Sequence, residues 1–158
     1  MPRIKKILFV CTGNSCRSVM AEGLLKHLLG KKGKTDIHVL SAGIGTYGGL
    51  GATPETIEVM KKQGIDVSQH VSQPLTPDLI HHAEAIFCME DYHYNRVLEL
   101  MPPAAGKVFL LKPFESKTPV MDPNIPDPIG RPKEVYESCL LTIKEAVEKV
   151  AKWLEKQS

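Results

Sequence analysis

The sequence predicts a single α/β domain spanning residues 1–158, with a doubly wound, four-stranded parallel sheet and helices on both faces. Three observations support this prediction. A chain of 158 residues is long enough for one well-cored domain and short for two. Its 42% hydrophobic and 24% charged residues are typical of a compact globular protein. Short apolar runs alternate with segments of helical periodicity, which is the pattern of parallel strands joined by right-handed helical crossovers.

The first half of the chain opens with a nearly continuous apolar run at residues 4–10, which predicts a strand buried on both faces. After the loop CTGNSCRS, residues 19–29 place apolar side chains at helical spacing, and a glycine follows them. Residues 37–40 predict a second strand. A helix over residues 53–63 is expected because a Thr-Pro pair supplies its cap and first position.

The second half continues the alternation of strands and helices. A second Thr-Pro pair opens a short helix at residue 76, and residues 85–88 predict the third strand. A helix over residues 90–101 ends at two prolines, and residues 108–111 predict the fourth strand. The last helix, residues 132–155, repeats apolar side chains every three or four positions along one face.

Charge and hydropathy exclude several functional classes. With a net charge of +2, the chain lacks the polybasic signature of a nucleic-acid or membrane binder. No stretch approaches the roughly 20 apolar residues that span a bilayer, and the apolar run at residues 7–10 is too short for a signal peptide. We expect a cytoplasmic protein with reduced thiols, in which Cys88 and Cys139 are buried as small hydrophobic residues.

The segment that joins the first strand to the first helix has the features of an anion-binding loop. The strand delivers Cys11 to the carboxyl edge of the sheet, where ligands bind in open α/β folds. Residues 12–17 lead to a helix N-terminus, whose free N–H groups and dipole favour an anion. Gly13 and Asn14 tolerate the left-handed backbone conformations of a tight turn. We therefore predict a phosphate-binding loop after the first strand.

Cys11, Arg17 and Ser18 supply the chemistry expected of this loop. The positive field of the loop predicts a Cys11 pKa well below the free value of about 8.5, which would make the thiolate a nucleophile. The planar fork of Arg17 suits two phosphate oxygens and favours the transition state over the ground state. Ser18 can donate a hydrogen bond to the thiolate. Because Arg17 and the backbone amides supply positive charge, neither a metal nor another cofactor is expected.

Cleaving a phosphate ester also requires a proton for the leaving oxygen, and an acid on a loop that faces the phosphate is the best donor. Residues 112–131 show no convincing periodicity, and loops of this length in compact domains are commonly functional. This segment contains two Asp-Pro pairs. We favour Asp127 as the acid because Asp-Pro-Ile-Gly predicts a rigid turn just before the last helix, and Asp122 is the alternative.

Several other motifs are weaker evidence of function. C-x5-R alone is a common pattern, and its place between a strand and a helix is what makes it informative. Residues 43–48 match the dinucleotide pattern G-x-G-x-x-G, but no helix is expected directly after them, so we interpret them as a flexible loop. Tyr47 in that loop is a candidate aromatic wall beside the phosphate site. His81, His82 and His93 lack a metal-binding pattern and are expected at solvated helix positions.

Three motifs together resemble the low-molecular-weight protein tyrosine phosphatase family: CTGNSCRS at residues 11–18, SAG at 41–43 and Asp-Pro-Ile-Gly at 127–130. The resemblance implies that Cys11 forms a phosphocysteine while Asp127 protonates the leaving group, and that Asp127 then activates water. It implies a phosphorylated protein as substrate and inorganic phosphate as product. From the balanced charge we expect no nucleic-acid or membrane partner. The expected substrate-binding residues are Thr12, Gly13, Asn14, Ser15, Cys16, Ser18 and Tyr47.

Departures from the family pattern leave the substrate open between phosphotyrosine and phosphoarginine. Val19 stands where the family usually has proline, and Ile129 and Gly130 stand where tyrosine-specific members often carry aromatic residues. Residues 70–76 and the hydroxyl of Ser15 look more like the bacterial protein arginine phosphatases, which share the fold and mechanism. Phosphotyrosine is the leading hypothesis because it is the commoner activity of the family.

Three further alternatives concern the reaction and its control. The thioredoxin-coupled arsenate reductases also use C-x5-R but need an additional cysteine pair, and Asn95 stands where Cys88 would need its partner. A phosphopeptide-binding module without turnover is another alternative, against which Cys11 and an Asp-Pro acid both argue. Finally, a reversible disulfide between Cys11 and Cys16 would protect the nucleophile from over-oxidation, unless Cys16 only packs under the loop.

Overall fold

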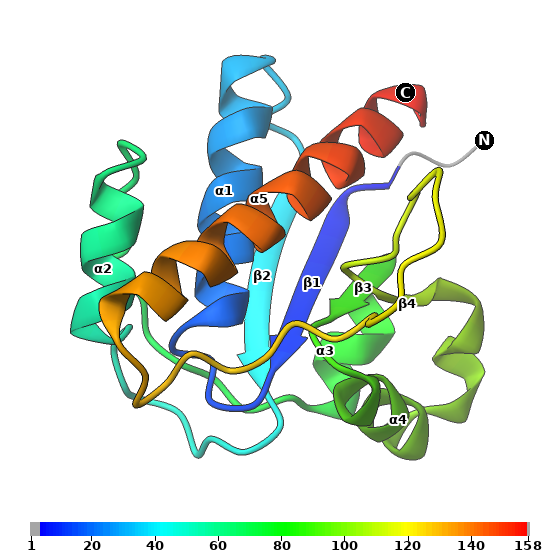
Figure 1. The fold of residues 1–158 in the computed structure, drawn as a ribbon. Helices are drawn as coiled ribbons and strands as arrows, with labels where there is room; N and C mark the ends of the chain where they lie inside the picture. Colours follow the sequence, from blue (N-terminus) through cyan, green and yellow to red (C-terminus); the bar gives the residue numbers. More distant parts are fainter. Residues whose placement is uncertain (1–3, 158) are drawn as a thin grey trace.

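The computed structural model describes residues 4–157, so the predicted domain of residues 1–158 extends beyond the described residues at both ends. Its sheet has four strands: β1 (Lys6–Cys11), β2 (His38–Gly43), β3 (Ala85–Cys88) and β4 (Val108–Leu110). The strand order is β2-β1-β3-β4, and each neighbouring pair is parallel. This confirms the predicted α/β class and places β1 in the centre of the sheet (Figure 1).

Helices cover both faces of the sheet because the side chains of the central strand alternate between them. Ile7 and Phe9 of β1 pack in a core with the helices α1 (Arg17–Lys31) and α5 (Lys133–Lys156). Leu8 and Val10 pack in a second core with α3 (Pro77–His82) and α4 (Asp91–Leu100). Figure 1 shows α5 crossing α1 and the sheet on one face. The structure also contains α2 (Pro54–Lys61) and, after α4, a 3-10 helix, η1 (Pro102–Lys107).

Two local features differ from the sequence prediction. The second strand reaches Gly43 instead of ending at Leu40, because Gly43 pairs with Cys11 on one side and bonds to Gln73 and Leu75 on the other. The two prolines that end α4 begin η1 rather than an irregular loop. The dinucleotide-like segment opens no helix, since α2 starts only at residue 54, and this agrees with its interpretation as a loop.

The long segment of residues 112–131 crosses the carboxyl edge of the sheet before it enters α5 (Figure 1). The Ile125 N–H donates to the Met89 carbonyl oxygen just beyond β3, at 2.9 Å, and Ile125 is buried. The middle of the segment is therefore anchored where ligands bind in open parallel sheets.

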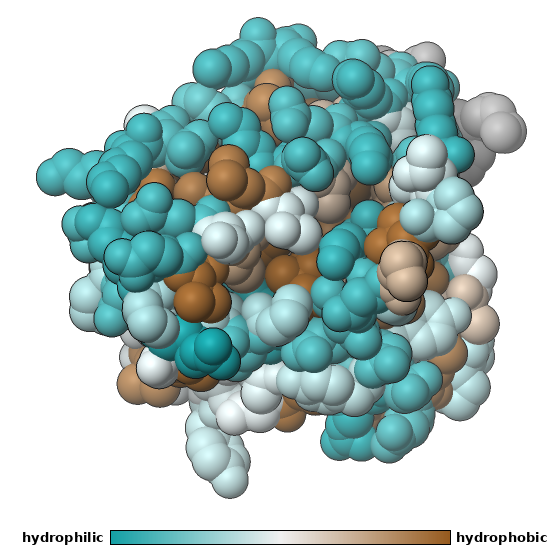
Figure 2. Space-filling view, viewed as in Figure 1, coloured by the Kyte–Doolittle hydropathy of each residue, from teal (hydrophilic) through white to brown (hydrophobic). Residues whose placement is uncertain are grey.

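The surface over α5 is mainly hydrophilic, with hydrophobic side chains visible only between polar ones (Figure 2). This follows from the amphipathic pattern of α5, whose buried residues Leu140, Ile143, Val147 and Val150 recur every three or four positions. Within residues 4–157, no helix is both long enough and apolar enough to cross a membrane.

Candidate active site

The loop between β1 and α1 wraps around the Cys11 sulfur, and we refer to residues 11–18 as the cradle. Asn14 has the left-handed conformation expected from the sequence, with φ 53°, and its N–H lies 3.3 Å from the Cys11 Sγ. A Cβ on Gly43 would lie 2.4 Å from the Thr12 carbonyl oxygen. Glycine at the end of β2 therefore allows the strand to approach the cradle this closely.

The environment of the Cys11 thiol has opposing effects on its pKa. Cys11 is only 2% exposed, and burial raises the pKa of its thiol. The Ser18 hydroxyl, 2.8 Å from the sulfur, the charge of Arg17 and nearby backbone N–H groups lower the pKa, but burial outweighs them. The predicted strong lowering of the Cys11 pKa is therefore wrong for this arrangement, in which Glu90 and Asp127 also offset the charge of Arg17.

The Arg17 guanidinium is buried and is held by groups from distant parts of the chain. Its Nη1 donates to the Glu90 carboxylate at 2.5 Å and to the Ile125 carbonyl oxygen at 2.7 Å. Its Nη2 is buried and has no hydrogen-bond partner among the described residues. Burial lowers the pKa of Arg17, but the Glu90 hydrogen bond and nearby charges outweigh it and raise the pKa, so the group stays cationic.

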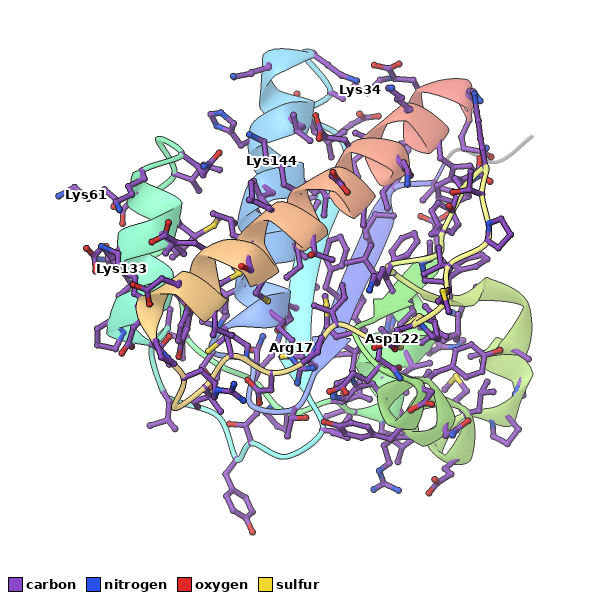
Figure 3. The ribbon with its side chains drawn as sticks, in the orientation of Figure 1. Arg17, Lys34, Lys61, Asp122, Lys133 and Lys144 are labelled. Atoms are coloured by element: carbon purple, nitrogen blue, oxygen red, sulfur yellow. The ribbon has the colours of Figure 1, made fainter. Side chains whose placement is uncertain are left out.

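The two candidate acids lie in different surroundings. The Asp127 Oδ2 is 3.6 Å from the Arg17 Nη2, and its Oδ1 accepts the Ile129 N–H in the turn that the sequence predicts. Asp122 is exposed and accepts the N–H of Asn124 in a similar local turn. Figure 3 shows Arg17 near the carboxyl end of β1 and Asp122 on the side of the molecule that carries α4. The geometry thus brings Asp127, rather than Asp122, to the cradle.

The prediction of a solvated His93 is wrong, because this side chain is fully buried. His93 is the third residue of α4, and its Nδ1 accepts the Glu90 N–H at 3.0 Å as half of a capping box. Burial and the charge of Arg17 lower the pKa of His93 to about 3, so the ring is neutral. Because Nδ1 accepts, Nε2 carries the proton and donates to the Thr12 Oγ1 at 2.8 Å.

The sequence analysis also did not identify several residues from other parts of the chain that contact the cradle. Glu90 follows β3, whose carboxyl end lies beside that of β1, so its position was a usable signal. His70 lies with its Nε2 2.8 Å from the Asn14 carbonyl oxygen, and the Gln73 N–H donates to the Asn14 Oδ1 at 2.9 Å. Each of these two hydrogen bonds joins residues more than fifty positions apart in the sequence, so no local sequence pattern predicts it.

The other predicted binding residues differ in exposure. Thr12, Gly13 and Ser15 are half-buried in the cradle, and Cys16 is buried. Tyr47 is fully exposed, so its role as an aromatic wall stays a prediction. Tyr92, which the sequence analysis did not single out, is partly exposed and has its hydroxyl 2.7 Å from the Thr12 Oγ1.

The four cysteines are free thiols, and all are buried. This confirms the expectation for Cys88 and Cys139. Burial raises the pKa of both thiols, that of Cys139 to about 12, so neither is a thiolate at neutral pH. His81 and His82 are exposed on α3, as expected. In the part of the chain that the structure describes, no group of three or more His, Cys, Asp or Glu side chains could hold a metal ion.

Comparison with known proteins finds similar sequences and similar solved structures. Residues 6–158 match the family model described as low molecular weight phosphotyrosine protein phosphatase. The probable low molecular weight protein-tyrosine-phosphatase EpsP of Ralstonia solanacearum is 37% identical over 145 residues, which cover 92% of each chain. The solved structure of the YwlE arginine phosphatase from Geobacillus stearothermophilus has a TM-score of 0.85 and 36% identity, and covers 96% of this chain and 94% of that one. Arsenate reductase 1 of Staphylococcus saprophyticus is 33% identical over 152 residues, covering 92% of this chain and 95% of that protein.

Proposed function

The chain belongs to the low molecular weight phosphotyrosine protein phosphatase family, and on that premise we propose that it hydrolyses phosphotyrosine in proteins. In this proposal Cys11 is the nucleophile, Arg17 holds the phosphate and Asp127 is the general acid. The backbone and side chains of Thr12, Gly13, Asn14, Ser15, Cys16 and Ser18 form the rest of the phosphate site.

One observation carries the proposal: the Arg17 Nη2 is a buried donor of a cationic group without a hydrogen-bond partner in the described residues. Leaving such a donor unsatisfied costs free energy unless a ligand satisfies it. The guanidinium is fixed by Glu90 and Ile125, so Nη2 is preorganised. A dianionic phosphate group seated over the Cys11 sulfur would satisfy this donor and the N–H groups at the start of α1.

In the first step the Cys11 thiol loses its proton to solvent, although burial raises its pKa, and the thiolate attacks phosphorus. The S–P bond forms and the P–O bond to the phenol breaks. Asp127 gives its proton to the departing phenolate oxygen. The planar guanidinium of Arg17 donates hydrogen bonds to the equatorial oxygens of the phosphoryl group. This planar arrangement of donors fits the transition state better than the ground state. The Ser18 hydroxyl and the Arg17 charge stabilise the thiolate against the cost of its burial.

In the second step water attacks the phosphocysteine, and the S–P bond breaks. The Asp127 carboxylate takes the proton from water, so the acid of the first step becomes the base of the second. The leaving thiolate again receives the Ser18 hydrogen bond. Inorganic phosphate leaves, and Cys11 and Asp127 return to their starting states.

Hydrolysis of phosphoarginine in proteins is the second candidate, and Ser15 favours it. Its half-buried hydroxyl belongs to the cradle, where it could position the attacking water or the polar guanidinium. Ile129 is half-exposed and aliphatic, so it offers no aromatic surface for a phenyl ring. The similarity to the Geobacillus arginine phosphatase is consistent with this candidate.

Arsenate reduction is less well supported, although an arsenate reductase is among the similar proteins. Cys88 lies at the end of β3 with its thiol buried, and Asn95 of α4 stands where a relay partner would be needed. The chain offers Cys16 and Cys139 as its remaining thiols besides Cys11, and both are buried.

The test is steady release of inorganic phosphate, first from a generic aryl phosphate and then from matched phosphotyrosine and phosphoarginine peptides. We expect turnover of all three by the wild-type protein, with kcat/KM highest for phosphotyrosine. A phosphoarginine preference above about tenfold, or roughly 1.4 kcal/mol in transition-state binding, would reject the lead in favour of the second candidate. The Ser15→Ile variant should shift the ratio toward phosphotyrosine, and an unchanged ratio would show that Ser15 does not set specificity.

A cytoplasmic location is also part of the proposal, because the proposed nucleophile works only as a free thiol. Cell fractionation with activity measured in each fraction tests it, and activity confined to a membrane or secreted fraction would contradict it.

A further inference from the structure

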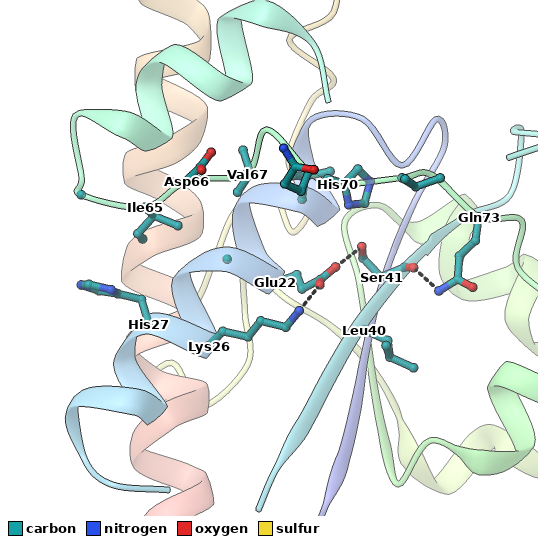
Figure 4. A pocket seen from close by; sticks show the side chains of 15 residues that line it. Glu22, Lys26, His27, Leu40, Ser41, Ile65, Asp66, Val67, His70 and Gln73 are labelled. Atoms are coloured by element: carbon teal, nitrogen blue, oxygen red, sulfur yellow. Dashed lines mark hydrogen bonds and ion pairs between the residues drawn. The ribbon is translucent and has the colours of Figure 1, made fainter. Parts of the chain in front are cut away.

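The phosphate of phosphotyrosine is joined to a flat phenyl ring, which needs a surface of its own to bind. A cavity of about 670 Å³ lies beside α1 and β2, with His27, Leu40 and Asp66 among its lining residues (Figure 4). Its lining residues include neither Cys11 nor Arg17, so this cavity is separate from the phosphate site. The ring of a phosphotyrosine seated in the cradle therefore lies elsewhere, against residues at the mouth of the cradle.

Tyr92 places an aromatic ring at the mouth of the cradle. It is the second residue of α4, it is 45% exposed, and its hydroxyl oxygen lies 2.7 Å from the Thr12 Oγ1. Burial lowers the pKa of Arg17, but Glu90, neighbouring charges and the Tyr92 hydroxyl raise it, so this hydroxyl lies beside the guanidinium. The hydroxyl end of the ring is thus held at the phosphate site, while the rest of the ring is partly open to solvent.

Two contacts fix the position of Tyr92. The neutral His93 ring accepts the Glu90 N–H at Nδ1 and donates from Nε2 to the Thr12 Oγ1 at 2.8 Å, so the hydroxyl that Tyr92 contacts is itself held in place. The Tyr92 ring also packs on the His93 ring, with centroids 4.2 Å apart and an angle of 45° between the planes. Because His93 is fully buried, the Tyr92 ring is preorganised, and a ligand that packs on it loses little binding free energy to ordering the side chain.

Three other side chains near the cradle are less suited to hold a phenyl ring. Tyr47 is fully exposed and makes no hydrogen bond or ring contact within residues 4–157, so a ligand would have to order it first. Ile129 is half-exposed but aliphatic. Tyr136 lies with its hydroxyl 3.8 Å from the Cys16 Sγ, but it is only 1% exposed and offers no face to a ligand.

We propose that Tyr92 is a substrate-binding residue that determines specificity: its ring forms a wall for the group that carries the phosphate, and its hydroxyl anchors that wall on Thr12. The wall selects a planar aromatic group, such as the phenyl ring of phosphotyrosine, because two rings attract each other by offset stacking or edge-to-face packing. This inference deepens the proposed function and rests on it in taking the cradle as the site of the phosphoryl group.

The experiment compares two ligands with the same phosphonate group, benzylphosphonate and methylphosphonate. Their P–C bond is not hydrolysed, so calorimetry gives both dissociation constants without turnover. The ratio of the two constants reports contacts to the phenyl ring, since contacts to the phosphonate are common to both. We expect the wild type to prefer benzylphosphonate, and Tyr92→Leu to reduce that preference by about three- to tenfold, the range of one aromatic pair.

Three further variants separate the ring of Tyr92 from other effects. Tyr92→Phe keeps the ring and its contact with His93, so it should reduce the preference by less than about twofold. Tyr47→Leu makes the same substitution at the other exposed tyrosine and should have a smaller effect than Tyr92→Leu. Asn95→Ala is the control within α4, because Asn95 is exposed in the next turn, and it should match the wild type.

An unchanged preference in Tyr92→Leu, or a larger loss in Tyr47→Leu than in Tyr92→Leu, would overturn the inference. If Tyr92→Leu does not fold, the NMR signals of the Tyr92 ring in the wild type decide. Benzylphosphonate should shift these signals more than methylphosphonate does, and equal shifts would reject the contact.

The binding measurements and the phosphate-release assay fail independently. A wild-type protein that shows the Tyr92 effect but releases no phosphate would reject the proposed function and leave the inference standing. Phosphate release by the wild type together with an unchanged preference in Tyr92→Leu would reject only the inference.

Discussion

At the scale of single residues, Arg17 is proposed to bind the phosphate and Cys11 to attack it, so substitutions of the two residues should have different effects. Cys11→Ser should abolish turnover yet retain phosphate binding, because a neutral hydroxyl is a far poorer nucleophile while the cradle survives. Arg17→Ala should lose both and should also leave the Glu90 carboxylate without its cation. Phosphate release and isothermal calorimetry with inorganic phosphate measure the two properties. Substantial turnover by Cys11→Ser would refute the covalent mechanism.

The assignment of the general acid depends on which carboxylate reaches the cradle. Asp127→Ala should slow phosphoenzyme formation by roughly 10²–10⁴-fold with poor leaving groups, and much less with an acidic phenol that needs no proton. Asp122→Ala is the matched control and should have little effect, since Asp122 bonds locally to Asn124. Exchanged phenotypes of the two variants would assign the acid to Asp122.

Cys16 provides a redox test within the cradle. Peroxide should oxidise the Cys11 thiolate to a sulfenic acid, which the Cys16 thiol then attacks to form a disulfide with release of water. The Cys16 Sγ also contacts the Thr53 Oγ1 at 3.4 Å, a packing role that competes with this function. Mass spectrometry of mildly oxidised protein tests the prediction, with Cys16→Ser as control. Sulfinic acid at Cys11 without a Cys11–Cys16 link in the wild type would show that Cys16 only packs.

At the scale of elements, the first turn of α4 connects the second core to the cradle through His93. The pKa of His93 is about 6.5 in an unfolded chain and about 3 in the fold, so protons bind the unfolded state preferentially between these values. This contribution to stability is complete above about pH 6.5 and is lost progressively as the pH falls toward 3.

We therefore expect the free energy of unfolding to fall more steeply between pH 7 and pH 4.5 in the wild type than in His93→Gln, which cannot be protonated. Urea unfolding at the two pH values measures the difference. His82→Gln is the matched control, because His82 is exposed on α3 and should keep the wild-type pH dependence. Equal pH dependence in the wild type and His93→Gln would contradict the buried neutral histidine.

At the scale of the whole molecule, β2 lies so close to the cradle that a substitution at their contact should affect both stability and activity. In Gly43→Ala the new Cβ would lie 2.4 Å from the Thr12 carbonyl oxygen and 3.0 Å from the Asn14 nitrogen, both backbone atoms. We expect a loss of about 1–3 kcal/mol in stability and a larger proportional loss of kcat/KM, because the strand and the cradle must separate.

Gly30→Ala is the control for Gly43→Ala, since nothing lies within 4 Å of a Cβ at this helical position. It should raise stability by roughly 0.5–1 kcal/mol and leave kcat/KM unchanged. Thermal unfolding together with phosphate release measures both effects. A Gly43→Ala protein with wild-type activity would show that the cradle does not depend on this contact.

The sequence by itself determined the features that depend on neighbouring residues. The periodicities placed every strand and α-helix, with errors of a few residues at their ends, because side-chain alternation and capping act within one or two turns. The order of Cys11, Asn14 and Arg17 between a strand and a helix also indicated the cradle, since a short run of adjacent residues can enclose an anion with its own backbone.

The tertiary structure alone decided how distant residues complete that cradle. Glu90 pairs with Arg17 from 73 positions away, and Asn14 bonds to Ser41 from 27 positions away. These contacts depend on strand order and register, which bring the carboxyl ends of β1, β2 and β3 to one edge. The same long-range packing buried His93 and made burial the largest influence on the pKa of Cys11. The free-energy cost of burying a group depends on all the atoms that surround it, and not only on its neighbours in sequence.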